Sequence, residues 1–216
     1  MSSTNRGTER QKEDYYVTPL WCVRQFMHAW DECFVMPESV LDPCAGGDVY
    51  NPMSYPTVLQ EWGVNDITTV DIREDSLATI TGDYLQMNMT RKYDMIITNP
   101  PYTLAQDFID RSFENLKPYG FLVMLLRLNF FGAQRRGEWW QTHLPNYAWV
   151  HSRRPSFFPD NWKEIMPEGT KKGTDSCEYA HFVWQKGKPV KATALRVIED
   201  IRGTNDLPGP YYQEAA

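Results

Sequence analysis

The chain lacks the cysteine patterns of metal-bound or disulfide-linked proteins. Its 216 residues include four cysteines and four histidines, and no two cysteines have the CxxC spacing of a zinc or redox motif. No histidine stands at ligand spacing from a cysteine, so we expect no metal site. The expected state is reduced, with Cys22 and Cys44 as small buried apolar side chains.

Long apolar runs are also missing. No stretch approaches the roughly 20 residues that a helix needs to span a bilayer, and the polar start has no apolar centre of a signal peptide. We therefore expect a cytoplasmic protein without a membrane partner. Residues 1–14 are predicted to be a flexible tail, 15–188 a single domain, and 189–216 a C-terminal extension.

A general excess of positive charge is absent as well. The formal net charge of -6 argues against a protein coated in basic residues. Basic residues nevertheless concentrate in the second half, with aromatic residues among them, at Arg135, Arg136, Arg153, Arg154, Lys163, Lys171 and Lys172. A local basic surface is therefore compatible with the overall negative charge.

What the chain does contain is an alternation of apolar strands and amphipathic helices. The spacing of apolar residues predicts helices over 20–34, 55–62 and 105–116, with a shorter helical pattern at 194–201. Apolar runs predict strands over 40–41, 66–71, 93–98, 121–127, 147–151 and 178–184. This order predicts an α/β fold with a Rossmann-like, doubly wound and mostly parallel sheet, whose ligands sit at the carboxyl ends of the strands.

The predicted strand at 93–98 ends at Asn99, Pro100, Pro101 and Tyr102. The prolines lack backbone donors, so the carbonyls of this turn can accept hydrogen bonds from a ligand. Asn99 adds a side-chain acceptor, and Tyr102 adds a flat aromatic face. Two prolines can also simply end a strand. Together, however, these groups suit a planar amine that is polarised and oriented for N-alkylation.

Glycines and acids follow the earlier strands. The loop from Asp42 to Gly47 contains two glycines, which permit close approach of a ligand to the backbone. Asp71 ends the next strand, where a carboxylate can accept both hydroxyls of a ribose, and Asp83 could accept the amino group of an adenine. Each acid alone could belong to a solvated turn or a helix cap. Their order before the Asn-Pro-Pro-Tyr turn indicates a nucleotide-type ligand.

With these motifs in this order, the sequence resembles the S-adenosylmethionine-dependent amino-methyltransferases. The resemblance covers about 14–184 and is to the DNA adenine-N6 methyltransferases of the small phage or bacterial type. It implies the class I methyltransferase form of the sheet, with S-adenosyl-L-methionine as cofactor. The cofactor-binding residues that it implies are Tyr16, Thr18, Pro19, Asp42, Pro43, Cys44, Ala45, Gly46, Asp71, Ile72, Asp83, Tyr84 and Asn99.

The resemblance makes Asn99, Pro100, Pro101 and Tyr102 the catalytic tetrapeptide. It implies that an adenine is flipped out of the duplex onto Tyr102 and polarised by Asn99 and the Pro100 carbonyl. The stretch 154–157 resembles the motif whose aromatic residue holds the extruded base. Residues expected to contact the substrate are Phe157, Phe158, Arg135, Arg136, Arg153, Arg154, Lys171 and Lys172.

Other substrates and roles stay open at this stage. The same tetrapeptide occurs in enzymes that methylate RNA adenine or a glutamine amide nitrogen of a protein, and a non-catalytic nucleic-acid-binding subunit is a further alternative. The segment after Trp184 is too short for a separate target-recognition domain. We therefore expect relaxed specificity, a homodimer or a separate recognition subunit.

Overall fold

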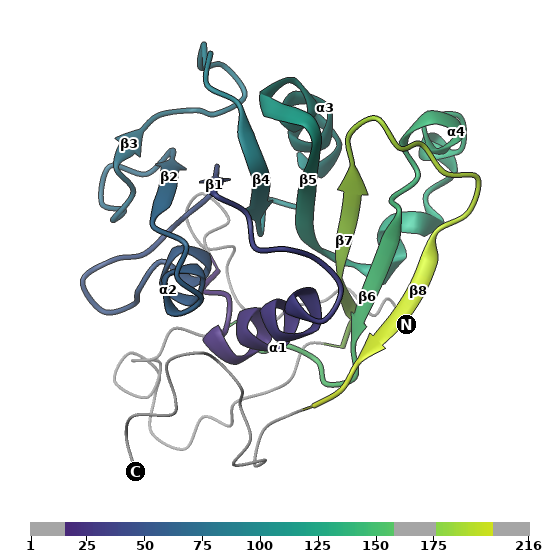
Figure 1. The fold of residues 1–216 in the computed structure, drawn as a ribbon, viewed down its shortest axis with the longest axis horizontal. Helices are drawn as coiled ribbons and strands as arrows, with labels where there is room; N and C mark the ends of the chain where they lie inside the picture. Colours follow the sequence, from purple (N-terminus) through teal and green to yellow (C-terminus); the bar gives the residue numbers. More distant parts are fainter. Residues whose placement is uncertain (1–15, 158–175, 201–216) are drawn as a thin grey trace.

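The apolar strands assemble into one sheet with helices on both faces (Figure 1). The structure is a computed structural model, and it describes residues 16–157 and 176–200. In this part of the chain the sheet has eight strands in the order β3-β2-β1-β4-β5-β7-β6-β8. The strands are β1 (Ser39–Asp42), β2 (Asp66–Asp71), β3 (Ile80–Thr81), β4 (Tyr93–Thr98), β5 (Leu116–Arg127), β6 (Tyr147–His151), β7 (Tyr179–Gln185) and β8 (Ala194–Ile198).

All pairings in the described sheet are parallel except those of β7. That strand runs antiparallel to both β5 and β6, and β8 then pairs parallel with β6 at the edge. The predicted fold class, a mostly parallel Rossmann-like sheet in a single domain, is therefore confirmed. None of the described helices combines the length and the apolar character needed to cross a bilayer.

Two helical layers cover the sheet. Helices α1 (Leu20–Asp31) and α2 (Ser54–Glu61) lie side by side on one face (Figure 1). The other face carries α3 (Ala105–Asn115) and α4 (Trp140–His143), with the short 3₁₀ helices η2 (Leu128–Gly132) and η3 (Gln134–Arg136) between β5 and α4.

Strand β4 shows why the middle of a central strand is apolar at successive positions. Met95 and Ile97 pack in the cluster under α1 and α2, whereas Ile96 packs in the cluster under α3. Successive side chains of a strand point to opposite faces, so the part of a strand that is covered on both sides is apolar at successive positions, while the polar Asp94 and Thr98 lie toward the two ends of β4. This pattern places β4, and the turn that follows it, at the centre of the molecule.

The helical pattern predicted at 194–201 was wrong. Over its described part the chain forms β8, with Tyr147 paired to Ala194 and His151 to Ile198. The edge of β6 offers unpaired backbone groups, and pairing with them outweighs the weak helical propensity of a five-residue segment. The helix predicted to reach Phe34 ends at Asp31, and β3 was not predicted. The tail at 1–14 lies outside the described residues.

The carboxyl ends of β1, β2 and β4 meet at one edge of the sheet. β1 pairs in parallel with β2 on one side and with β4 on the other. These strands end at Asp42, Asp71 and Thr98, respectively. The three loops that carry the predicted motifs therefore leave the sheet next to one another, as expected for a ligand site in this architecture.

Candidate active site

Asn99 leaves the end of β4 and contacts the segment that precedes α1. Its Nδ2 donates a hydrogen bond to Thr18 Oγ1 over 3.0 Å. Its Oδ1 is buried and has no hydrogen-bond partner in the part of the chain that the structure describes. Buried polar atoms are nearly always paired. An unpaired acceptor here is therefore available to a donor supplied by a ligand.

Thr18 is itself held in place by a hydrogen bond from a residue of α2. Ser54 Oγ donates to the Thr18 carbonyl over 2.6 Å, and Thr18 itself is buried. Asn99 is thus held by a side chain that lies 81 positions away in the sequence. The structure thus brings together two predicted motifs that are distant in the sequence, the segment around Thr18 and the Asn-Pro-Pro-Tyr turn.

Tyr102 faces a cavity of about 260 Å³ beside this turn. Arg127, at the end of β5, places its guanidinium carbon 5.4 Å from the centre of the Tyr102 ring. Arg127 Nε also donates to Tyr179 Oη over 3.0 Å. The cavity is lined by Tyr102, Thr103, Gln106, Asp107, Phe130, Arg135 and Arg136.

Arg127 and Tyr179 were missed by the sequence reasoning. Both lie inside runs that read only as strands, β5 and β7, so no local pattern marks them. The Tyr179 ring lies 6.1 Å from that of Tyr102 and 4.9 Å from that of Phe157. The three rings therefore form an aromatic wall behind Tyr102, and the Arg127 cation lies over the rings of Tyr102 and Tyr179.

The loop after β1 is shaped by its glycines and fastened to β2. Gly46 and Gly47 have φ angles of 62° and 75°, in the left-handed region that favours glycine. The Gly46 amide donates to Asp71 Oδ2 over 2.8 Å, and Arg73 Nη2 donates to the Gly47 carbonyl over 2.7 Å. The acid at the end of β2 therefore positions the glycine loop directly.

Replacement of Gly47 by alanine should destabilise the protein by about 1 to 3 kcal/mol. The new Cβ would be strained by the positive φ and would lie 2.8 Å from Met53 Cγ. Gly132 is the control, because a Cβ there meets nothing within 4 Å. Urea unfolding of both variants measures the effect, and equal stability of the two would contradict this account of the loop.

Asp71 is almost fully buried, with 7% of its surface exposed. Its Oδ1 accepts from the Arg73 amide over 2.9 Å, while its Oδ2 holds Gly46. Each carboxylate oxygen has two lone pairs, so acceptor capacity remains for a ligand hydroxyl. The next residue, Ile72, is 57% exposed and offers an apolar surface beside the loop.

The neighbouring residues Asp83 and Tyr84, both predicted to bind the cofactor, have different surroundings. Asp83 accepts a hydrogen bond from the Leu85 amide and lies in the loop after β3. The Tyr84 side chain, in contrast, is buried against Phe108, and its hydroxyl donates to Asn115 Oδ1 over 3.2 Å. Only the main chain of Tyr84 is therefore left to contact a cofactor, because its ring belongs to the core under α3.

Asp42 is buried at the end of β1. Burial raises its pKa to about 7, from an ordinary value of 3.8. Its Oδ1 accepts from the Cys44 amide over 3.2 Å, and hydrogen bonding from the Cys44 amide and the Thr98 side chain offsets part of the rise in pKa that burial causes. Pro43 and Ala45 are also buried, so the start of the loop is enclosed.

This pKa predicts a pH-dependent stability. The folded protein holds the Asp42 proton up to about pH 7, whereas the unfolded chain releases it near 3.8. The contribution of Asp42 is therefore greatest at low pH, and it falls between about pH 4 and 7 by up to roughly 1.4 kcal/mol per pH unit. Urea unfolding of wild type and Asp42→Asn at pH 5, 6, 7 and 8 isolates this contribution. Parallel stability curves would refute it.

The predicted DNA-contacting arginines differ in their surroundings. Arg135 is exposed and lines the cavity beside Tyr102. The guanidinium carbon of Arg153 lies 5.4 Å from the Trp21 ring centre. Arg154 forms an ion pair with Glu178 over 2.5 Å. Arg136 is only 7% exposed and donates through Nε and Nη2 to the Phe130 carbonyl. Arg136 therefore braces η2, and because it also lines the cavity beside Tyr102, its expected contact with DNA stays a prediction.

The remaining predicted substrate residues are only partly described. Phe157 is partly buried, and it packs with Tyr179 near Tyr102. Phe158, Lys171 and Lys172 lie outside the described residues.

The remaining predicted cofactor-binding and catalytic residues flank Asn99. Tyr16 and Pro19, like Thr18, belong to the segment before α1, and both are partly exposed. Pro100 is buried and Pro101 partly so, and the Pro101 carbonyl accepts from the Leu104 amide.

No family model and no curated protein matches the sequence. Solved structures do match the fold. One is a protein from Listeria monocytogenes described as a class I S-adenosylmethionine-dependent methyltransferase, with a TM-score of 0.54, 15% identity, and coverage of 90% of this chain and 67% of that one. Another, from Pyrococcus horikoshii and described as an RNA methyltransferase, has a TM-score of 0.57, 12% identity, and coverage of 83% and 92%.

A third similar structure is the M protein of the type I restriction enzyme EcoKI. It has a TM-score of 0.52 and 13% identity, and the match covers 80% of this chain and 44% of that chain. At these identities the likeness concerns the fold. The chain described here has the class I methyltransferase fold.

Proposed function

We propose that the protein transfers a methyl group from S-adenosylmethionine to the N6 amine of adenine in DNA. The observation that carries the proposal is the placement of Asn99 and Tyr102. They lie at the end of β4, beside the glycine loop after β1 and the acid after β2. This edge juxtaposes a site for a planar amine with a site for a nucleotide-type cofactor.

The described residues fit this cofactor. Asp71 retains acceptor capacity for the ribose hydroxyls, Ile72 offers an exposed apolar surface for a flat base, and Asp83 can accept from an adenine amino group. When bound, S-adenosylmethionine supplies an electrophilic methyl group on its sulfonium.

The chain's own residues would act on the amine by positioning it. Asn99 Oδ1 and the Pro100 carbonyl accept the two amine hydrogens, which draws the nitrogen lone pair out of conjugation with the ring. One face of the Tyr102 ring would support the base, and the Arg127 guanidinium lies over the ring with its carbon 5.4 Å from the ring centre. These residues provide orientation and directed hydrogen bonds rather than a strong base.

A duplex adenine must leave its stack to reach this edge. The cavity beside Tyr102 gives an extruded base room, and exposed Arg135 at its border can meet a phosphate. We further propose that a homodimer or a separate recognition subunit supplies sequence selection. Proteins that share the fold include the EcoKI M protein and one described as an RNA methyltransferase, so RNA is the main alternative substrate.

Methyl-labelled S-adenosylmethionine tests the proposal. The protein is incubated separately with duplex DNA, RNA and a protein extract, and each polymer is then digested and its labelled product identified. We expect label in N6-methyladenine of DNA. Label confined to RNA adenine or to protein glutamine would establish those alternatives instead. Cofactor binding without transfer to any polymer would favour a non-catalytic subunit.

A further inference from the structure

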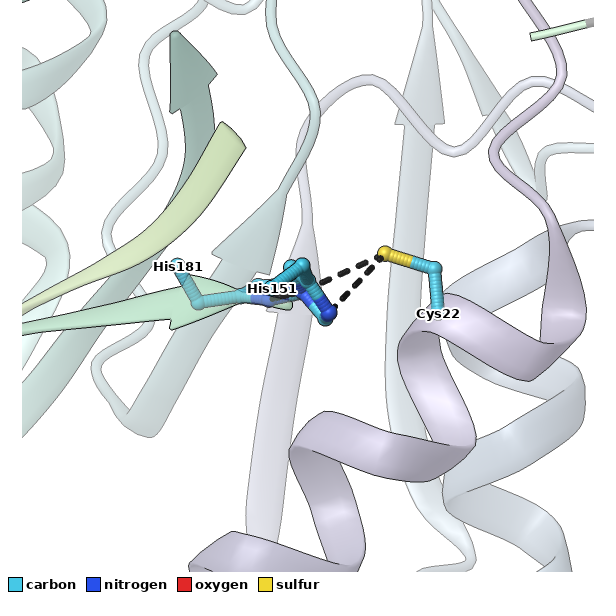
Figure 2. Close-up of side chains that lie close together, drawn as sticks. All are labelled: Cys22, His151 and His181. Atoms are coloured by element: carbon cyan, nitrogen blue, oxygen red, sulfur yellow. Dashed lines mark hydrogen bonds between the residues drawn. The ribbon is translucent and has the colours of Figure 1, made fainter. Parts of the chain in front are cut away.

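Three potential metal ligands meet in the core, outside the residues assigned to methyl transfer. Cys22 extends from α1 toward His151 at the end of β6 and His181 in β7 (Figure 2). Cys22 Sγ lies 3.3 Å from His151 Nε2, and that nitrogen lies 2.8 Å from His181 Nδ1. All three side chains are buried.

The spacing of these atoms is close to that of ligands around one ion. The three donor atoms all lie within 4.8 Å of one another. In a tetrahedral zinc site, with Zn–S of about 2.3 Å and Zn–N of about 2.0 Å, neighbouring ligand atoms are roughly 3.3 to 3.6 Å apart. Admitting an ion would separate the two imidazole nitrogens by about half an ångström more, and Cys22 Sγ, which lies 3.3 Å from Nε2 and 3.9 Å from Nδ1 of His151, would turn toward the Nε2 lone pair.

A further contact orients one imidazole for this role. Tyr55 Oη lies 3.0 Å from His181 Nε2, and the Phe26 ring stacks on the imidazole with centroids 4.1 Å apart. When Nε2 donates to Tyr55, the Nδ1 lone pair points into the cluster. Metal-binding histidines commonly have such a partner on the second ring nitrogen, which fixes the tautomer and the ring plane.

We propose that Cys22 Sγ, His151 Nε2 and His181 Nδ1 bind a zinc ion. A thiolate and two imidazoles form a sulfur and nitrogen donor set that suits zinc, whereas magnesium and calcium require oxygen ligands. On binding, the zinc–sulfur bond replaces the bond from sulfur to hydrogen, and the thiol proton is released to water. The fourth position is left to a water molecule. This site departs from the sequence-based expectation of no metal.

The charge states of the three groups are compatible with binding. Burial lowers the pKa of His151 to about 4 and that of His181 well below its ordinary value, so both imidazoles are neutral near pH 7. Neutral imidazole is the form that binds a metal. Burial raises the pKa of the Cys22 thiol, so the free protein keeps it protonated until a cation stabilises the thiolate.

The ion would connect the beginning of α1 to the sheet. Cys22 lies in the first turn of the helix, and its amide donates to the Pro19 carbonyl over 2.9 Å. Thr18, the residue before Pro19, accepts a hydrogen bond from Asn99 Nδ2 through its side-chain hydroxyl. Zinc would therefore stabilise the segment that holds Asn99 without touching the reacting groups. The proposal rests on the cluster alone and stands whether or not the protein methylates DNA.

Metal content of the full chain, purified without a histidine tag, tests the site. The protein is equilibrated with zinc chloride, freed of excess metal by gel filtration and analysed by mass spectrometry. We expect one zinc per chain in wild type and in Cys33→Ser, whose thiol is exposed, and loss of zinc in Cys22→Ser. No stoichiometric zinc in wild type, or undiminished zinc in Cys22→Ser, would overturn the proposal.

Two measurements on wild type avoid dependence on a variant that could misfold. Cobalt(II) added in place of zinc should give the visible bands of a tetrahedral ion together with a thiolate-to-cobalt charge-transfer band. Zinc should also raise the Tm, and a chelator should reverse the rise. A cobalt spectrum without the thiolate band, or a Tm insensitive to zinc, would count against the site.

Discussion

Replacement of Asn99 by alanine is expected to lower the rate constant of methyl transfer by about 10² to 10³-fold. The substitution removes the buried Oδ1 acceptor, which has no partner in the described structure and which we assign to the substrate amine. S-adenosylmethionine affinity should change little, because Asp71 and the glycine loop are untouched. Single-turnover kinetics with saturating cofactor and DNA, together with calorimetric cofactor titration, separate the two effects.

Two further variants sharpen this test. Asn65→Ala is a matched control, because that exposed side chain bonds only the Gly63 carbonyl in the described structure, and it should retain activity. Thr18→Val removes the acceptor of Asn99 Nδ2 and should slow transfer by less than Asn99→Ala, because the Oδ1 acceptor survives but is less well oriented. Unchanged transfer by Asn99→Ala would exclude the proposed role.

Replacement of Asp71 by alanine should weaken S-adenosylmethionine binding by about 10 to 100-fold. Hydrogen bonds to a charged group contribute roughly 1.5 to 3 kcal/mol, which corresponds to that range of affinity. The loss has two sources, because Asp71 both faces the proposed ribose site and holds the Gly46 amide. Titration calorimetry with S-adenosylmethionine measures the change, and thermal unfolding reports damage to the fold.

Asp75 provides the control for charge and position. It is an exposed acid that pairs with the same Arg73, so Asp75→Ala should leave cofactor affinity within about 2-fold. Asp71→Asn should fall between wild type and Asp71→Ala, because it keeps one acceptor oxygen but presents an amide donor to its neighbours. Wild-type affinity in a folded Asp71→Ala protein would rule out Asp71 as a cofactor ligand.

Much of the site could be predicted because it follows strand ends. The strand periodicity predicted β1, β2 and β4, and parallel strands bring their carboxyl ends to one edge. Asp42, Asp71 and Asn99 were therefore expected together before the fold was known. The exposure of individual side chains was not predictable in this way. Tyr84 was expected to contact the cofactor and Arg136 the substrate, yet packing against Phe108 and Phe130, respectively, buries both side chains.

The wall around Tyr102 and the buried Cys22 cluster depend on contacts between distant segments. Cys22 and His151 are separated by 129 positions, and His151 and His181 by 30. The three side chains come into contact only because α1 packs on a sheet in which β7 lies antiparallel beside β6. No local spacing encodes such a contact, which is why the cysteine pattern predicted no metal site.

The sequence alone determined the fold class, the sheet edge of the site and the chemical character of its turn. Those properties depend on periodicity and on residue types that act over a few neighbouring positions. Tertiary structure decided which side chains face the ligand, which brace the core, and that one thiol and two imidazoles share a buried space. Such outcomes depend on how whole faces pack, and close packing admits one arrangement of side chains among the many that local pattern allows.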